Sequence, residues 1–200
     1  PVVYLLHGYT DNETAWIQFG TVQHSVDKGI AAGTIAPMVI VMPDAGVTFY
    51  VNEASGNMNY EDMFFKEFIP FIESNYKIRA KKEFRGICGL SMGGYGTMLY
   101  ALKHPDMFAA AAPLSAAFFD EDYLNNMSED QYNTMMKKLY GQDTEGERIS
   151  RHFMENNVIH LARTLPEESL KKVRYYIDCG DEDFLYKGNA MMWTILMDRK

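Results

Sequence analysis

The stretch of sequence that decides the fold reads Phe84-Arg85-Gly86-Ile87-Cys88-Gly89-Leu90-Ser91-Met92-Gly93-Gly94. It begins as an apolar run typical of a buried strand. It then passes into Gly89-Leu90-Ser91-Met92-Gly93, which fits the G-x-S-x-G pattern of a sharp strand-to-helix turn that exposes its serine. Gly94 and Gly96 weaken an exposed helix but allow a helix to approach a strand closely, which an ordinary serine in a glycine turn would not require. We therefore predict that Ser91 is a nucleophile.

Four further apolar runs predict the other strands of a sheet, at residues 2–6, 38–42, 109–114 and 173–179. Between these runs, apolar residues at helical spacing predict helices at residues 60–75 and 93–103. Strands that alternate with helices predict an α/β fold with a mostly parallel central sheet and helices on both faces. Ligands of such sheets bind beyond the carboxyl ends of the strands.

Residues 118–170 interrupt this alternation, because they are polar, rich in methionine and helical in tendency. We interpret them as a helical cap within a single domain that covers residues 1–200. Their aromatic and methionine side chains could line a pocket or pack the cap, and both alternatives stay open. These side chains are Phe118, Phe119, Tyr123, Met127, Tyr132, Met135 and Met136.

Composition excludes several classes of partner. A net charge of -8 makes nucleic acid and anionic membranes unfavourable partners. No apolar run approaches the roughly 20 residues that cross a bilayer, and no secretion signal opens the chain. The compartment stays unknown. Cys88 and Cys179 lie in separate apolar runs without the spacing of metal ligands, so we expect two buried free thiols and no metal.

The end of the first strand carries His7-Gly8-Tyr9. A serine nucleophile needs N–H donors for the developing oxyanion. One donor is the residue after the nucleophile, Met92, and a second comes from a loop that follows an earlier strand, which we assign to Tyr9. We expect His7 to brace this loop, because the base normally follows the nucleophile in the chain.

Together these motifs resemble the esterase D-like family of α/β-hydrolases, which includes feruloyl, acetylxylan and tributyrin esterases, S-formylglutathione hydrolases and mycolyltransferases. The resemblance runs through residues 5–8 with Trp16, residues 41–44, 60–73, 89–94 and 178–183. It implies an α/β-hydrolase fold, an acyl-enzyme on Ser91, and no metal or cofactor. The family's Gly-x-x-Asp motif places the acid of the triad at Asp183, with Asp181 as the alternative.

The histidine of the triad is where the sequence departs from the family. In this family the triad residues occur along the chain in the order serine, acid, histidine, yet none of the five histidines follows Asp183. We expect the chain to lack the first and last strands of the fold, and the histidine with them. Recruitment of His152 or His160 from the cap is the alternative.

The resemblance also implies the substrate class. We predict hydrolysis of short-acyl or hydroxycinnamoyl (feruloyl, acetyl) esters, with a small-molecule or carbohydrate-linked substrate such as a decorated plant polysaccharide. Tyr50, Asp44 and Trp16 are the candidate substrate contacts. S-formylglutathione hydrolysis, acyl transfer and non-catalytic carbohydrate binding are the alternatives, and homo-oligomerisation stays open.

Overall fold

The computed structural model describes residues 1–200 and contains a five-stranded parallel sheet. The strands are β1 (Val2–Leu6), β2 (Val39–Val41), β3 (Arg85–Leu90), β4 (Ala110–Leu114) and β5 (Arg174–Tyr175). All five predicted strands are confirmed. The last is shorter than predicted, because β5 has a neighbour on one side only and the chain beyond it keeps a single bridge, between Leu114 and Asp178.

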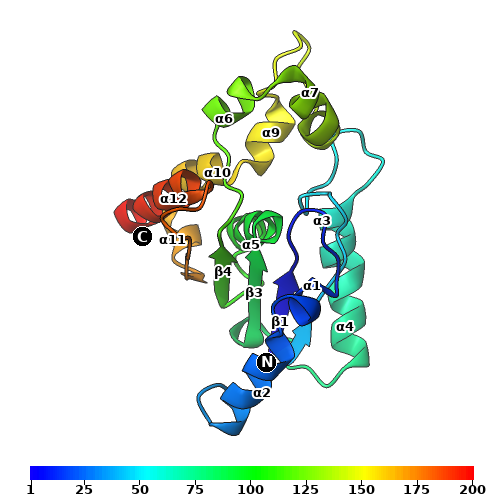
Figure 1. The fold of residues 1–200 in the computed structure, drawn as a ribbon, viewed down its shortest axis with the longest axis vertical. Coiled ribbons are helices and arrows are strands. Elements are labelled where there is room, and N and C mark those ends of the chain that lie inside the picture. The colour runs from blue at the N-terminus through cyan, green and yellow to red at the C-terminus, as the bar shows by residue number, and fades with distance from the viewer.

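Helices connect and cover these strands (Figure 1). Before β3 they are α1 (Ala15–Gln18), α2 (Val22–Ala31), α3 (Tyr60–Met63), the π-helix η1 (Phe64–Phe68), α4 (Ile69–Asn75) and the short η2 (Lys82–Phe84). After β3 they are α5 (Met92–Lys103), α6 (Glu121–Asn126), α7 (Glu129–Gln131), the π-helix η3 (Tyr132–Met136), α8 (Lys137–Tyr140), α9 (Arg151–Asn156), α10 (Val158–Thr164), α11 (Glu167–Leu170) and α12 (Tyr186–Arg199). The helix predicted over residues 60–75 is thus continuous, with one π turn inside it.

Strand order locates the functional edge of the sheet. The order is β2-β1-β3-β4-β5, so the chain moves one way from β1 to β2 and the other way from β2 onwards. Right-handed crossovers then place α1 and α2 on one face and α4 and α5 on the other. The direction reverses between β1 and β3, and ligands of open α/β sheets bind beyond the strand ends at such a point. His7-Gly8-Tyr9 and Ser91 follow these two strands.

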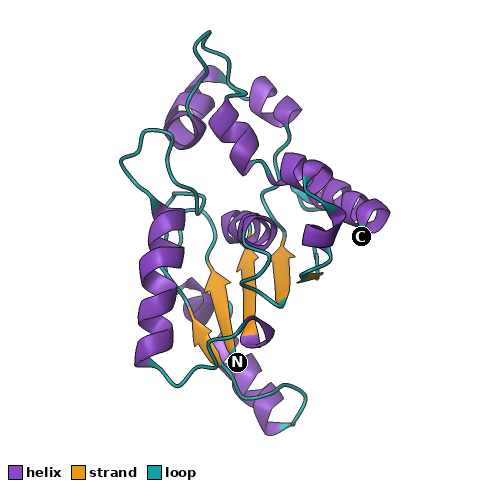
Figure 2. Ribbon diagram, turned by 180° about the vertical axis from the view of Figure 1, so that it is seen from behind, coloured by secondary structure: helices purple, strands orange, loops and turns teal.

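Residues 118–170 contain six α-helices, one π-helix and no strand. Figure 1 shows α6, α7 and α9 beyond the carboxyl ends of the strands, and Figure 2 shows the same arrangement from behind. No helix of the structure combines the length and apolar character needed to cross a membrane.

Candidate active site

Ser91 occupies a strained turn between β3 and α5. Its backbone has φ 56° and ψ -113°, a conformation that residues with a side chain rarely adopt. The turn is held from both sides, because Ser91 N–H donates to the Leu114 carbonyl and the Ser91 carbonyl accepts from Ala117 N–H, both at 3.0 Å. Such strain persists only where the surroundings over-determine it, and it concentrates at functional sites.

Glycines make this turn possible. A Cβ atom at Gly89 would overlap the Gly93 carbonyl, and one at Gly93 would overlap the carbonyls of Leu6 and His7. The start of α5 therefore sits directly on the ends of β1 and β3. The spacing of glycines around Ser91 is explained by packing as well as by the turn.

Two backbone N–H groups beside Ser91 have no acceptor in the protein. Met92 is the first residue of α5, where helical N–H groups lack intrahelical partners. Tyr9 N–H donates to no protein group either. An ideal Cβ at Gly8 would lie 3.8 Å from Ser91 Cβ, so this loop runs alongside the serine. These are the two N–H groups that we predicted from the sequence as donors to the oxyanion, and both are free to donate.

His7 braces the loop, as predicted. The imidazole is buried, its Nε2 accepts from Ala45 N–H at 2.8 Å, and its Nδ1 lies 2.8 Å from the Gly8 carbonyl oxygen. Because Nε2 accepts, Nδ1 carries the proton and donates to that carbonyl. Both ring nitrogens are occupied, which leaves His7 no capacity to take a proton from Ser91.

The structure corrects the expectation that Tyr50 contacts substrate. Tyr50 is fully buried, and its hydroxyl donates to the His7 carbonyl at 3.0 Å. Burial raises the pKa of Tyr50 well above its usual value, so the hydroxyl remains a donor. Tyr100 in turn donates to the Tyr50 carbonyl at 2.7 Å. Tyr50 is therefore a core support of the loop that follows β1.

Asp44 and Trp16 are the other two expected substrate contacts. Asp44 is exposed and its Oδ1 accepts from Gly46 N–H at 2.9 Å, as turn chemistry alone requires. The Trp16 indole donates to the Leu6 carbonyl at 3.0 Å, which fixes α1 against the end of β1.

Asp183 lies at the turn before α12, two strands away from Ser91. Its Oδ1 accepts from Leu185 N–H at 2.8 Å, and its second carboxylate oxygen has no protein partner. Neighbouring strand ends are joined by hydrogen bonds, since Ser91 N–H donates to Leu114 and Ser115 N–H donates to Asp178 at 2.7 Å. Asp183 is partly buried, whereas Asp181 is exposed.

None of the other four histidines hydrogen-bonds Ser91, and the side chains of two of them have partners elsewhere. His104 contacts the buried Glu61 at 2.8 Å, and His152 Nε2 lies 2.8 Å from the Asn52 carbonyl oxygen. His160 lies on α10 and His24 on α2. His152 and His160 are thus not brought to the serine in this structure.

A pocket of about 220 Å³ lies on the β1 side of Ser91. We name it the α1 pocket. It is bounded by the loop after β1, by α1 and by the residue before the serine, and it is lined by His7, Gly8, Asp11, Ala15, Trp16, Phe19, Gly20 and Leu90. Its walls are mainly aromatic and aliphatic, with one carboxylate at Asp11.

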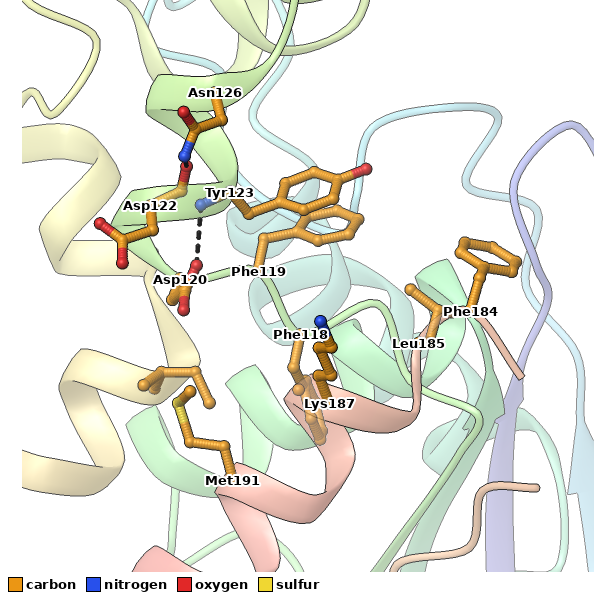
Figure 3. Close-up of a pocket in the computed structure, with 12 residues that line it drawn as sticks. Phe118, Phe119, Asp120, Asp122, Tyr123, Asn126, Phe184, Leu185, Lys187 and Met191 are labelled. Atoms are coloured by element: carbon orange, nitrogen blue, oxygen red, sulfur yellow. Dashed lines mark hydrogen bonds between the residues drawn. The ribbon is translucent and has the colours of Figure 1, made fainter. Parts of the chain in front are cut away.

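A second pocket, of about 330 Å³, lies on the other side of the serine, between α6 and α12 (Figure 3). We name it the α6–α12 pocket. One wall begins at Phe118, beside the Ala117 N–H that contacts Ser91, and the other begins at Phe184, directly after Asp183. The remaining lining residues are Phe119, Asp120, Asp122, Tyr123, Asn126, Ile159, Leu185, Lys187, Gly188 and Met191.

The structure separates the cap residues whose role the sequence left open. Phe118, Phe119 and Tyr123 line the α6–α12 pocket, whereas Tyr132 and Met136 are buried and Met135 packs against the core. The Phe119 and Tyr123 rings are stacked, with centroids 4.3 Å apart. The cap therefore uses its aromatic residues before α6 and within it for the pocket, and its methionines at 135 and 136 for packing.

Sequence reasoning missed two supports of the site. Asn189 on α12 clamps the backbone of Ala116, accepting from its N–H and donating to its carbonyl. Phe49 packs between Tyr9 and Phe119, with centroids 5.8 and 6.3 Å from theirs. Phe49 lies in a loop and has φ 50°, and hydrophobic periodicity does not predict the packing of such a loop residue.

Cys88 and Cys179 are free thiols, and both are partly rather than fully buried. Burial raises the pKa of Cys88 to about 11, so this thiol is not a nucleophile near neutral pH. No three histidine, cysteine, aspartate or glutamate side chains come together as metal ligands would.

Comparison with known proteins gives a family and several similar proteins. The esterase family described as "Putative esterase" matches residues 1–199. A solved ferulic acid esterase is 30% identical with a TM-score of 0.82, over all of this chain and 73% of that one. An acetyl esterase of Caldicellulosiruptor saccharolyticus is 27% identical over 97% of this chain and 70% of its own length.

An endo-1,4-beta-xylanase/feruloyl esterase of Xylanibacter ruminicola is 35% identical over 60% of this chain. The matched segment is only 17% of that protein, so this chain spans a small part of a much longer relative.

Proposed function

The chain belongs to this esterase family and has its α/β-hydrolase fold, and on that premise we propose that it hydrolyses carboxylic esters with Ser91 as nucleophile. The observation that carries the proposal is the strained backbone of Ser91, held between β3 and α5 with two unpaired N–H groups beside it. The strain projects the serine at the sheet's switch point, where a ligand binds.

The proposed reaction proceeds through an acyl-enzyme. Ser91 Oγ attacks the ester carbonyl while its proton passes to a general base, and the N–H groups of Met92 and Tyr9 donate to the oxyanion. Collapse of the tetrahedral intermediate breaks the bond to the alcohol oxygen, which leaves with the proton from the base. Water then repeats the sequence and releases the acid.

Asp183 is the proposed acid that would orient the base, because its unpartnered carboxylate oxygen is available to an imidazole N–H. None of the five histidines hydrogen-bonds Ser91, and His7 has both ring nitrogens engaged. We propose that the base comes from polypeptide outside residues 1–200. Without the base, we expect hydrolysis about 10³ to 10⁴ times faster than the uncatalysed reaction in water, which is the residual rate of serine hydrolases that lack a triad member.

The α1 pocket is the proposed site of the acyl group. Its walls at Trp16, Phe19 and Leu90 suit a hydroxycinnamoyl ring or a short acyl chain, and Leu90 is adjacent to the nucleophile. Relatives named feruloyl esterase and acetyl esterase support this substrate class. We propose short-acyl or hydroxycinnamoyl esters, carried on plant polysaccharide, as substrates.

Chemical rescue tests the proposal on the 200-residue chain. Imidazole in solution should accelerate release of nitrophenol from 4-nitrophenyl acetate by the wild-type chain, because it replaces the missing base. The Ser91→Ala variant measures the reaction of imidazole alone. Equal rates for the two proteins at every imidazole concentration would refute ester hydrolysis through Ser91.

A further inference from the structure

We propose that the α6–α12 pocket binds the sugar to which the ester is attached, so that it is a glycosyl subsite on the leaving-group side of Ser91. The inference rests on the proposed function, because it divides the substrate of that reaction between the two pockets. It adds an assignment of the second pocket, its ligand class and the residues that recognise it.

The order of the strands shows on which side of Ser91 each pocket lies. The α1 pocket follows β1, on one side of Ser91, while the α6–α12 pocket follows β4 and β5, on the side of Asp183. In a serine hydrolase the base lies between the nucleophile and the acid, and it donates a proton to the leaving group. The alcohol must therefore depart toward Asp183. The pocket that begins directly after Asp183 receives it.

The chemistry of the pocket fits a sugar better than an acyl chain. The stacked rings of Phe119 and Tyr123 offer an aromatic face, and Tyr123 is half exposed (Figure 3). Aromatic faces pack against the C–H groups of a sugar ring, and polar groups at the rim recognise hydroxyls.

Polar groups of the right kind are unpaired at this rim. Asp122 and Lys187 form no ion pair, and the side-chain oxygen of Asn126 accepts no hydrogen bond, since only its amide nitrogen is used, toward the Asp122 carbonyl. A carboxylate accepts from hydroxyls, an ammonium donates to them and an amide does both. The α1 pocket has one carboxylate among mainly apolar walls and lacks such a set.

Titration calorimetry on the full 200-residue chain tests the assignment with two probes, xylotetraose for the glycosyl side and ferulate for the acyl side. Tyr123→Ala should raise the Kd for xylotetraose roughly tenfold, or about 1.4 kcal/mol, and Asp122→Asn should raise it severalfold. Tyr76→Ala is the matched control, because Tyr76 is also an exposed tyrosine but lies at the end of α4. It should leave both ligands unaffected.

Ferulate should show the opposite dependence. Phe19→Ala should weaken ferulate and not xylotetraose, and Tyr123→Ala should leave ferulate unchanged. Absence of saturable xylotetraose binding, or equal Kd values in wild type and Tyr123→Ala, would overturn the subsite. Loss of ferulate binding in Tyr123→Ala would show that the pockets are assigned in reverse. Xylotetraose binding at Tyr123 without any Ser91-dependent hydrolysis would refute the proposed function and with it the leaving-group role, and would leave only a sugar-binding site at Tyr123.

Discussion

Replacement of Ser91 by glycine should make the protein more stable than replacement by alanine. Ser91 has φ 56° and ψ -113°, and a non-glycine residue in such a conformation costs about 1–3 kcal/mol. Alanine keeps the Cβ atom and therefore the strain, whereas glycine removes it. The side chain of Ser91 makes no capping hydrogen bond to α5, so neither variant loses one.

The magnitude follows from two opposing effects. Glycine adds unfolded-state entropy that costs about 0.4–1 kcal/mol relative to alanine, so the net gain in the free energy of unfolding should be about 1 kcal/mol. For a chain of this size that is a rise in Tm of about 2–4 °C.

Thermal denaturation followed by circular dichroism, on both variants at one protein concentration, measures this difference. A Ser91→Gly protein that melts below Ser91→Ala would show that the turn stores no strain, and the structural argument for the nucleophile would lose its basis.

Three further predictions concern the supports of the site. Tyr50→Phe leaves the buried His7 carbonyl without its donor and should lower the free energy of unfolding by about 1–3 kcal/mol in urea denaturation; an unchanged value would mean that the loop after β1 has another anchor. Burial alone would raise the pKa of Glu61, but the hydrogen bonds from His104 and Lys103 outweigh it and lower the pKa. A lowered carboxyl pKa stabilises the folded protein above the unfolded pKa of about 4.5, and this stability is lost as the pH falls through the folded pKa. The free energy of unfolding of wild type should therefore exceed that of Glu61→Gln by less as the pH falls below the folded pKa. A difference that persists at the lowest pH would contradict this. In protein that contains the proposed base, Asp183→Asn should lower kcat by up to about 10⁴-fold while Asp181→Asn is mild, and the reverse ranking would move the acid to Asp181.

The sequence predicted the sheet well because buried parallel strands are continuous apolar runs that end at turns. The runs predicted at residues 2–6 and 84–88 correspond to the observed strands Val2–Leu6 and Arg85–Leu90, because each run leads into a glycine-containing turn. The length of the edge strand β5 was overestimated. Apolar residues continue to Cys179, but hydrogen-bonded strand pairing also requires a neighbouring strand.

The site was only partly predictable. The proposed nucleophile Ser91 and the proposed donors Met92 and Tyr9 rest on local motifs, because a strand-to-helix turn and a loop after a strand are encoded over a few residues. Tyr50 was misassigned, since nothing in the sequence tells that a tyrosine beside a predicted loop turns into the core to meet the His7 carbonyl. The division of the cap into pocket and packing residues required the tertiary structure.

The central claim, that Ser91 is the nucleophile, is tested most directly by locating the adduct of a fluorophosphonate probe by peptide mass spectrometry. Ser115 provides the matched control, because it also follows a strand of the sheet and has a positive φ, of 38°. The account predicts one adduct, on Ser91, that is retained in Ser115→Ala and absent in Ser91→Ala. An adduct on another residue, or labelling that survives Ser91→Ala, would contradict it.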